Sequence, residues 1–206
     1  MIPAMWLHKN GMKAEITSYT LYGVIFMSFI KNQKRKIRSI IRVELCRIDL
    51  KCVIIGAVII LLCGFLSAFV GCPADGFGTF FRCLERPRFT PPAFLFPIIW
   101  TLLYILIGAA AGAVACARER SLEADKFKGL LFFILMMVFN FVWTPLFFGA
   151  GAFFAAFCAI IMMLILSFFA ACFFFRIFVL SGAAMVIYIL WLLFAAYLNL
   201  GVIILN

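Results

Sequence analysis

A long apolar stretch in the second half of the chain contains a few polar and amphipathic side chains at helical spacing. Asn140 and Trp143 lie three residues apart, and Tyr188 and Trp191 repeat that spacing. Around them, residues 129–206 carry a single charged side chain. Polar side chains are costly in hydrocarbon, so inside a membrane they usually mark a binding site or a contact between helices. These residues therefore predict a site inside a membrane-embedded helix bundle.

A third pair, Trp100 and Tyr104, lies four residues apart and would share one face of another helix. Trp and Tyr in membrane helices commonly form belts at the two interfaces. A belt does not explain Trp191 or Asn140, because each lies near the middle of its apolar stretch. An intramembrane Asn can instead bond a neighbouring helix, and that alternative stays open. Together, the three pairs predict the lining of a cavity for a large, flat, mostly apolar ligand.

The residues needed for catalysis or metal binding are missing from this pattern. His8 is the sole histidine in the sequence and no Cys-x-x-Cys pair occurs, so a zinc site is not expected. The predicted spans hold no carboxylate pair, so we expect no catalytic residue, no metal and no required cofactor. Cys72 and Cys83 flank a predicted loop and either form a disulfide in an oxidising space or stay free. Four other cysteines lie in apolar stretches, where Cys packs as a small hydrophobic residue: Cys63, Cys116, Cys158 and Cys172.

The composition excludes an ordinary soluble domain. Hydrophobic residues make up 67% of the 206 residues, charged residues make up 13%, and the mean hydropathy is +1.21. A soluble domain has about 25% charged residues. The net charge of +10 is concentrated in residues 1–51, which hold ten Lys/Arg against three Asp/Glu. A basic segment beside an apolar bundle is typical of a membrane-surface anchor rather than a nucleic-acid arm, so we expect the lipid bilayer and no nucleic acid as a partner.

Uncharged stretches divide the rest of the chain into membrane spans of about 20 residues or more. The stretch 129–175 is too long for one crossing and contains a turn signal, Gly149-Ala150-Gly151. The sequence therefore predicts an all-α integral membrane bundle of five transmembrane helices in residues 52–206, with a basic N-terminal extension, residues 1–51. The expected spans are 52–74, 91–117, 129–149, 151–175 and 177–205.

The N-terminal extension has several interpretations. Residues 16–30 are uncharged but too short for a span, and they suit a signal-peptide core or an interfacial helix. The extension is an amphipathic surface helix, a disordered segment, or upstream sequence from a misassigned start codon. The Lys/Arg distribution predicts that the N-terminus lies inside and the C-terminus outside. The inner side would then carry the ten basic residues of the extension together with Arg118, Arg120, Lys126, Lys128 and Arg176. The outer side would carry only Arg82, Arg86 and Arg88.

The loop before the second span, residues 73–90, ends in an unusual lead-in. Residues 86–92 are Arg-Pro-Arg-Phe-Thr-Pro-Pro, and prolines hold such a segment rigid and extended. We expect Pro91 or Pro92 to occupy the first turn of the span, and Pro97 to bend or loosen the turns that follow. A stiff loop of this kind predicts a lid over the bundle, although a simple helix start is the plainer alternative.

These motifs resemble those of a known family. Residues 86–92, followed by Pro97-Ile-Ile-Trp-Thr-Leu-Leu-Tyr104, are similar to the loop and second helix of the translocator proteins, also called tryptophan-rich sensory proteins or TspO/MBR proteins. Residues 140–149, Asn-Phe-Val-Trp-Thr-Pro-Leu-Phe-Phe-Gly, resemble the third-helix motif of that family. Residues 191–199, Trp-Leu-Leu-Phe-Ala-Ala-Tyr-Leu-Asn, resemble its fifth-helix motif. The resemblance covers about residues 52–206.

The resemblance implies a five-helix bundle, usually a homodimer, that binds porphyrins in a pocket under the first loop. It predicts a membrane receptor or sensor that modulates tetrapyrrole or stress physiology, with protoporphyrin IX or a heme-like molecule as ligand. The alternatives are a carrier of porphyrins or other lipophiles, a light-dependent porphyrin-degrading enzyme, and a structural membrane protein. The ligand-binding residues expected from the motifs are Phe89, Pro91, Pro92, Phe96, Trp100, Tyr104, Asn140, Trp143 and Trp191.

The chain also departs from the family pattern. Phe89 and Phe94 stand where relatives often have Trp, which keeps apolar area but removes indole N–H donors. Fewer pocket tryptophans weaken the expectation of porphyrin photodegradation. The sterol-binding pattern fails after Tyr197, because no Lys or Arg follows it. We expect a bacterial-type plasma membrane location, with the mitochondrial outer membrane as the alternative.

Overall fold

The bundle is formed by five long apolar helices. The computed structural model of the protein describes residues 29–71, 76–77, 80 and 83–206. Within these residues, five helical segments are long and apolar enough to cross a membrane. They contain α2 (Leu50–Val70), α4 (Leu95–Ala115), α5 (Glu123–Thr144), α6 (Phe153–Ile177) and α7 (Val179–Leu205). The short turns η1 (Arg120–Leu122) and η2 (Pro145–Gly149) extend α5 at its two ends. The predicted all-α membrane bundle is confirmed.

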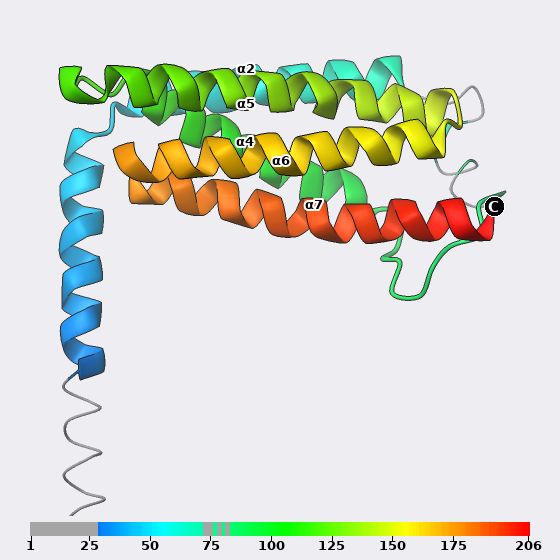
Figure 1. The fold of residues 1–206 in the computed structure, drawn as a ribbon, viewed down its shortest axis with the longest axis horizontal. Helices are drawn as coiled ribbons and strands as arrows, with labels where there is room; N and C mark the ends of the chain where they lie inside the picture. Colours follow the sequence, from blue (N-terminus) through cyan, green and yellow to red (C-terminus); the bar gives the residue numbers. More distant parts are fainter. Residues whose placement is uncertain (1–28, 72–75, 78–79, 81–82) are drawn as a thin grey trace, which may run out of the picture. The chain divides into compact units, whose positions relative to one another are not determined.

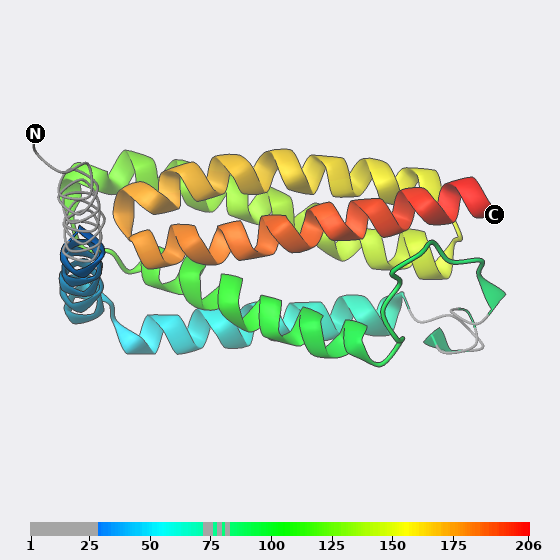
Figure 2. The same ribbon diagram turned by 90° about the horizontal axis from the view of Figure 1, so that it is seen from below.

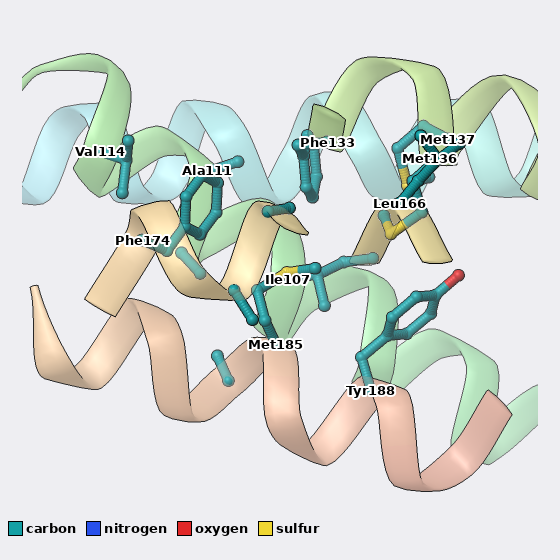
Figure 3. Close-up of a cluster of buried hydrophobic side chains, with 14 of the residues drawn as sticks. Ile107, Ala111, Val114, Phe133, Met136, Met137, Leu166, Phe174, Met185 and Tyr188 are labelled. Carbon is teal, nitrogen blue, oxygen red and sulfur yellow. The ribbon is translucent and has the colours of Figure 1, made fainter. Parts of the chain in front are cut away.

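The helices lie side by side, with α2 packed on α4, α5 on α6 and α6 on α7 (Figures 1 and 2). The loop before α4 lies at the end of the bundle where α7 finishes (Figure 2). Toward the other end, the interior is filled by side chains with at most 1% of their surface exposed, among them Ile107, Met136 and Met185 (Figure 3). This half of the bundle is a solid core.

Glycines let α2 and α4 approach until their backbones touch. A Cβ added to Gly56 would overlap the backbone of Gly108 and Gly112, and a Cβ on Gly112 would overlap the carbonyl of Cys52. Small residues commonly permit such close helix packing in membranes. Gly108 and Gly112 of α4 therefore serve a helix contact inside the bundle.

A disulfide joins the same two helices. Cys52 and Cys116 are bonded, with their Cα atoms 6.3 Å apart. The expectation that Cys116 packs as a small hydrophobic residue is wrong, because close packing of α2 on α4 brings together two thiols that are 64 residues apart. The disulfide that the sequence left open involves Cys72, which lies outside the described residues, while Cys83 is free and exposed.

The proline-rich lead-in differs from the prediction. Pro91 and Pro92 precede the helix, which begins at Leu95, and the backbone N–H of Leu95 donates to the Pro92 carbonyl at 3.0 Å. The expectation that one of them occupies the first helical turn is wrong. Pro97 takes the third helical position, where its missing N–H costs no bond because the first four N–H groups of a helix have no intrahelical partner. Pro97 is therefore accommodated in the first turn of α4.

The connections around α6 are very short. Residues 150–152 join η2 to α6, and Gly151 supports the turn with a φ of +62°. At the other end, one extended residue, Phe178, separates α6 from α7. Arg176, expected between two spans, instead lies in the last turn of α6 and forms an ion pair with Asp125 at 3.3 Å. A helix C-terminus favours a cation.

The chain divides into two compact units, residues 1–46 and 47–206, and the bundle belongs to the second. In the first unit, the described residues are helical from 29 onward, and this helix runs to residue 47. Most of the predicted short stretch 16–30 lies outside the described residues. The next helix, α2, begins after Asp49, whose carboxylate accepts from the backbone N–H of Lys51 at 3.0 Å.

Candidate functional site

A cavity of about 420 Å³ lies in the end of the bundle under the loop before α4. Cavities that bind small molecules measure roughly 300–1,000 Å³ and are mostly apolar. Gly64 and Ala68 of α2 form one side, and the remaining helical walls come from α4, the end of α5 with η2, and α7. Residues 84–94 supply further lining side chains: Leu84, Arg86, Pro87, Thr90, Ala93 and Phe94.

Stacked aromatic rings form the walls of the cavity. The rings of Trp100 and Trp143 have centroids 6.1 Å apart with 30° between their planes, and Trp143 stacks on Phe147 at 5.1 Å and 23°. Trp100 also lies 5.5 Å from Tyr104, with 37° between the planes. Helical spacing brings Trp100 and Tyr104 to one face of α4, where both line the cavity. The arrangement offers broad ring faces that are moderately tilted against one another.

Polar groups along the cavity are few and mostly engaged. The indole N–H of Trp143 donates to Oδ1 of Asn199 at 3.3 Å, and Nδ2 of Asn199 donates to the Phe153 carbonyl at 3.0 Å. These bonds tie the Trp143 ring to α6 and α7. Among the described residues that line the cavity, Arg86 is the one with a formal charge. The site therefore combines apolar ring faces with one cation near its rim.

A chain of hydrogen bonds crosses the bundle at the edge of the cavity. The hydroxyl of Tyr104 donates to Oδ1 of Asn140 at 2.7 Å, and Nδ2 of Asn140 donates to the hydroxyl of Tyr188 at 2.7 Å. The Tyr188 hydroxyl in turn lies 3.7 Å from Sδ of Met163. These residues belong to α4, α5, α7 and α6 in that order. The network therefore fixes the relative positions of four helices and the orientation of Tyr104, a cavity wall.

Residues 84–94, called the strap below, are held against the end of α7. The backbone N–H and carbonyl of Glu85 bond the side chain of Asn206, each at 3.0 Å. The Tyr197 hydroxyl donates to the Arg88 carbonyl at 2.8 Å. Pro87 packs on Gly201 so closely that a Cβ at that glycine would overlap its ring. These contacts hold the strap over the cavity.

The structure places the predicted site residues in three groups. Phe96, Trp100, Tyr104 and Trp143 line the cavity. Asn140 is 1% exposed and lies in the hydrogen-bond network, as the helix-contact alternative for this residue predicts. Trp191 lies edge-on behind Trp100, with centroids 6.5 Å apart, and its indole N–H has no partner within the described part of the chain. The predicted site residues that lie outside the cavity lining within the strap are Phe89, Pro91 and Pro92.

Phe89 stands apart from the cavity in its conformation as well. It is 86% exposed and has a φ of +64°, a left-handed conformation that is uncommon for a residue other than Gly. The lining residues that were not predicted as site residues include Gly64, Phe147, Phe148 and Asn199. Asn199 carried a signal, because it is a polar residue within an apolar span. Gly64 carried none, since its role is to make room for the Tyr104 ring.

Comparison with known proteins identifies the family. The model of the TspO/MBR family matches residues 55–205. The chain belongs to the TspO/MBR family. Similar relatives include protein CrtK of Rhodobacter capsulatus, 35% identical over 146 residues, which are 67% of this chain and 89% of the relative. Tryptophan-rich protein TspO of Chlorobaculum tepidum is 31% identical over 140 residues, 68% of this chain and 85% of the relative. A translocator protein homolog of Schizosaccharomyces pombe is 30% identical over 122 residues, 59% and 74% of the two chains.

Membership of the TspO/MBR family confirms the resemblance found in the sequence motifs. Together with the five apolar helices, it establishes a multi-pass integral membrane protein. It also supports a membrane sensor or receptor role, the class of function predicted from the sequence.

Proposed function

We propose that this TspO/MBR protein is a membrane receptor or sensor for a planar, mostly apolar ligand of the porphyrin class, bound in the cavity under the strap. The observation that carries the proposal is the pair of stacked rings, Trp100 and Trp143, in the wall of a 420 Å³ cavity. Flat ring faces favour a flat ligand, because aromatic groups gain most from offset-stacked or edge-to-face contact.

The single formal charge of the described lining supports the same ligand class. Protoporphyrin combines a flat apolar ring with carboxylates at one edge. The Arg86 guanidinium, on the strap, suits a carboxylate because it presents several N–H donors in one plane. The ring would lie between the helices and the acidic edge would point toward the strap.

The packing of the bundle favours a receptor over a carrier. Beyond the hydrogen-bond network, fully buried side chains such as Ile107, Met136 and Met185 fill the interior among the described residues (Figure 3). Moving a porphyrin through this core would require several helices to separate. A receptor needs only the strap to move, and the strap is held by a small number of contacts.

We propose the orientation with the basic end of the bundle in the cytoplasm, on the Lys/Arg asymmetry described above. The Cys52–Cys116 disulfide lies at this basic end, close to Arg118 and Asp49. Disulfides persist mainly in oxidising compartments. In this orientation, the Cys52–Cys116 disulfide therefore faces the reducing conditions of the cytoplasm.

The experiment is a titration of the purified protein in lipid nanodiscs with protoporphyrin IX, followed by tryptophan quenching and porphyrin absorption. We expect saturable binding that Trp143→Ala weakens by about tenfold, because one ring face and its area are lost. Phe132→Ala is the matched control, since Phe132 stacks on Phe169 and Phe173 outside the cavity. Trp191→Phe tests whether the ring behind Trp100 contributes.

Porphyrin partitioning that does not saturate would refute the proposed site. So would a loss of porphyrin affinity in Phe132→Ala equal to the loss in Trp143→Ala. Binding that depends on Trp191 but not on Trp143 would move the ligand to the α4–α7 side of Trp100.

A further inference from the structure

The helix of residues 29–47 has two chemically different faces. At about 100° per residue, five apolar residues fall within one third of the helix circumference: Phe29, Ile30, Ile37, Ile40 and Ile41. Five basic residues fall within a separate arc of similar width: Lys31, Lys34, Arg35, Arg38 and Arg42. The helix is therefore amphipathic over its first turns, up to about residue 42; nearer its C-terminal end, Glu44 falls in the apolar arc and Leu45 in the basic arc.

Three side chains of the apolar face are exposed, whereas Ile30 and Ile41 are half-buried and Glu44 in the same arc is buried. Phe29 is 58% exposed, Ile37 55% and Ile40 38%. The cations of the opposite face are exposed as well. A helix with an apolar face and a Lys/Arg-rich polar face is the kind that lies in a membrane interface, its apolar side in the acyl boundary and its cations among the headgroups.

The chain connection holds this helix near a membrane surface. The helix ends at residue 47, and α2, the first membrane-spanning segment, begins at Leu50 after the capping residue Asp49. The three residue steps from position 47 to position 50 span only about 10 Å even when the chain is fully extended. The C-terminal end of the helix is thus confined to the interface where α2 leaves the bilayer, the same side as Arg118 and Arg176.

We infer that the 29–47 helix is a binding surface for anionic phospholipids, on which it lies with its apolar face in the membrane. Charge complementarity identifies the occupant. Five cations on one face favour an anionic partner, and a bilayer that supplies both acidic headgroups and hydrocarbon suits both faces at once. A free phosphate compound or a nucleic acid would satisfy the cations and leave the five apolar residues in water.

The test is hydrogen–deuterium exchange of the full-length protein in nanodiscs. One set contains phosphatidylcholine alone and the other is enriched in phosphatidylserine. We expect amides of residues 29–46 to exchange about tenfold more slowly in the anionic discs, and high salt to reduce this protection because exposed charges are screened. Exchange in α4 and α7 should be equal in both discs, which reports that the bundle is intact.

Matched variants separate the two faces from a general effect of charge. Arg38→Gln with Arg42→Gln should remove most of the lipid-dependent protection. Arg118→Gln with Arg120→Gln removes the same amount of charge from the bundle and should leave the lipid-dependent protection of residues 29–46 unchanged.

A second variant, Ile37→Ser with Ile40→Ser, keeps every cation and should also lose protection, because the apolar face is needed. Equal exchange in neutral and anionic discs would overturn the inference. Protection of residues 29–46 by added RNA in neutral discs would also overturn it. The same holds if the Arg118 and Arg120 variant loses as much lipid-dependent protection as the Arg38 and Arg42 variant.

Discussion

Replacing Asn140 by Leu tests the hydrogen-bond network directly. Asn140 is 1% exposed and bonds the hydroxyls of Tyr104 and Tyr188, each at 2.7 Å. The substitution keeps a side chain of similar size and removes both bonds. Tyr188 retains its contact with Met163 at 3.7 Å, whereas the Tyr104 hydroxyl loses its bond to Asn140 and faces the cavity.

The magnitude follows from the two bonds. Side-chain hydrogen bonds between membrane helices contribute about 0.6 kcal/mol on average and about 1.7 kcal/mol at most. Two such bonds predict a loss of about 1–3 kcal/mol in Asn140→Leu. The loss is modest because polar groups of the separated helices also find partners within the membrane.

A triple variant makes the prediction sharper. In Tyr104→Phe/Asn140→Leu/Tyr188→Phe every member of the network becomes apolar, so no buried hydroxyl or amide is left without a partner. Removing both partners of a buried hydrogen bond costs far less than removing one. We therefore expect the triple variant to be more stable than Asn140→Leu alone, within about 1 kcal/mol of the wild type.

The assay is equilibrium unfolding in mixed lipid–detergent micelles with increasing denaturing detergent, followed by near-ultraviolet circular dichroism. Tyr104→Phe and Tyr188→Phe complete the mutant cycle. The reasoning is refuted if the losses of the single variants simply add in the triple variant, or if Asn140→Leu is more stable than the wild type.

Two further predictions concern the strap and the disulfide. A Cβ at Gly201 would lie 2.5 Å from Cγ of Pro87, so Gly201→Ala should lift the strap at a cost of about 1–3 kcal/mol and accelerate porphyrin dissociation about tenfold in stopped-flow experiments. Gly149→Ala is the control, because nothing lies within 4 Å of its added Cβ; equal rates in the two variants would contradict the proposed lid. Loss of the Cys52–Cys116 bond, by Cys52→Ser or by reductant, should lower stability by up to about 4 kcal/mol on chain-entropy grounds. Unfolding midpoints that do not respond to reductant would show that the bond is not formed.

The expected spans and the helices observed agree closely, because both follow from one physical constraint. Hydrocarbon excludes charge over a fixed thickness, so each uncharged stretch of sufficient length marks a span. The boundaries that differ lie at charged helix ends and at prolines: the third span was expected to begin at residue 129, whereas α5 begins at Glu123 and includes Asp125 in its first turn. Arg176 extends α6 because a helix C-terminus accepts a cation, and α4 starts at Leu95 rather than at Pro91 or Pro92.

Part of the candidate site was also predictable. Spacing of three or four residues places Trp100 with Tyr104 on one helix face, and the structure brings both to the cavity with Trp143. The sequence did not show which way each polar residue would turn. Asn140 faces two tyrosines rather than the cavity, and Trp191 supports Trp100 from behind.

The sequence by itself determined the membrane bundle, its five spans, the family and the residues able to form an aromatic site. Only the tertiary structure decided the Cys52–Cys116 pairing, the Gly201–Pro87 contact and the assignment of Asn140 to the network. The physical reason is that these helices are apolar on all sides. In water, a polar face shows which side of a helix points outward. In lipid, an apolar side chain can face either the bilayer or the protein interior, so the packing of one helix on another determines the inward face.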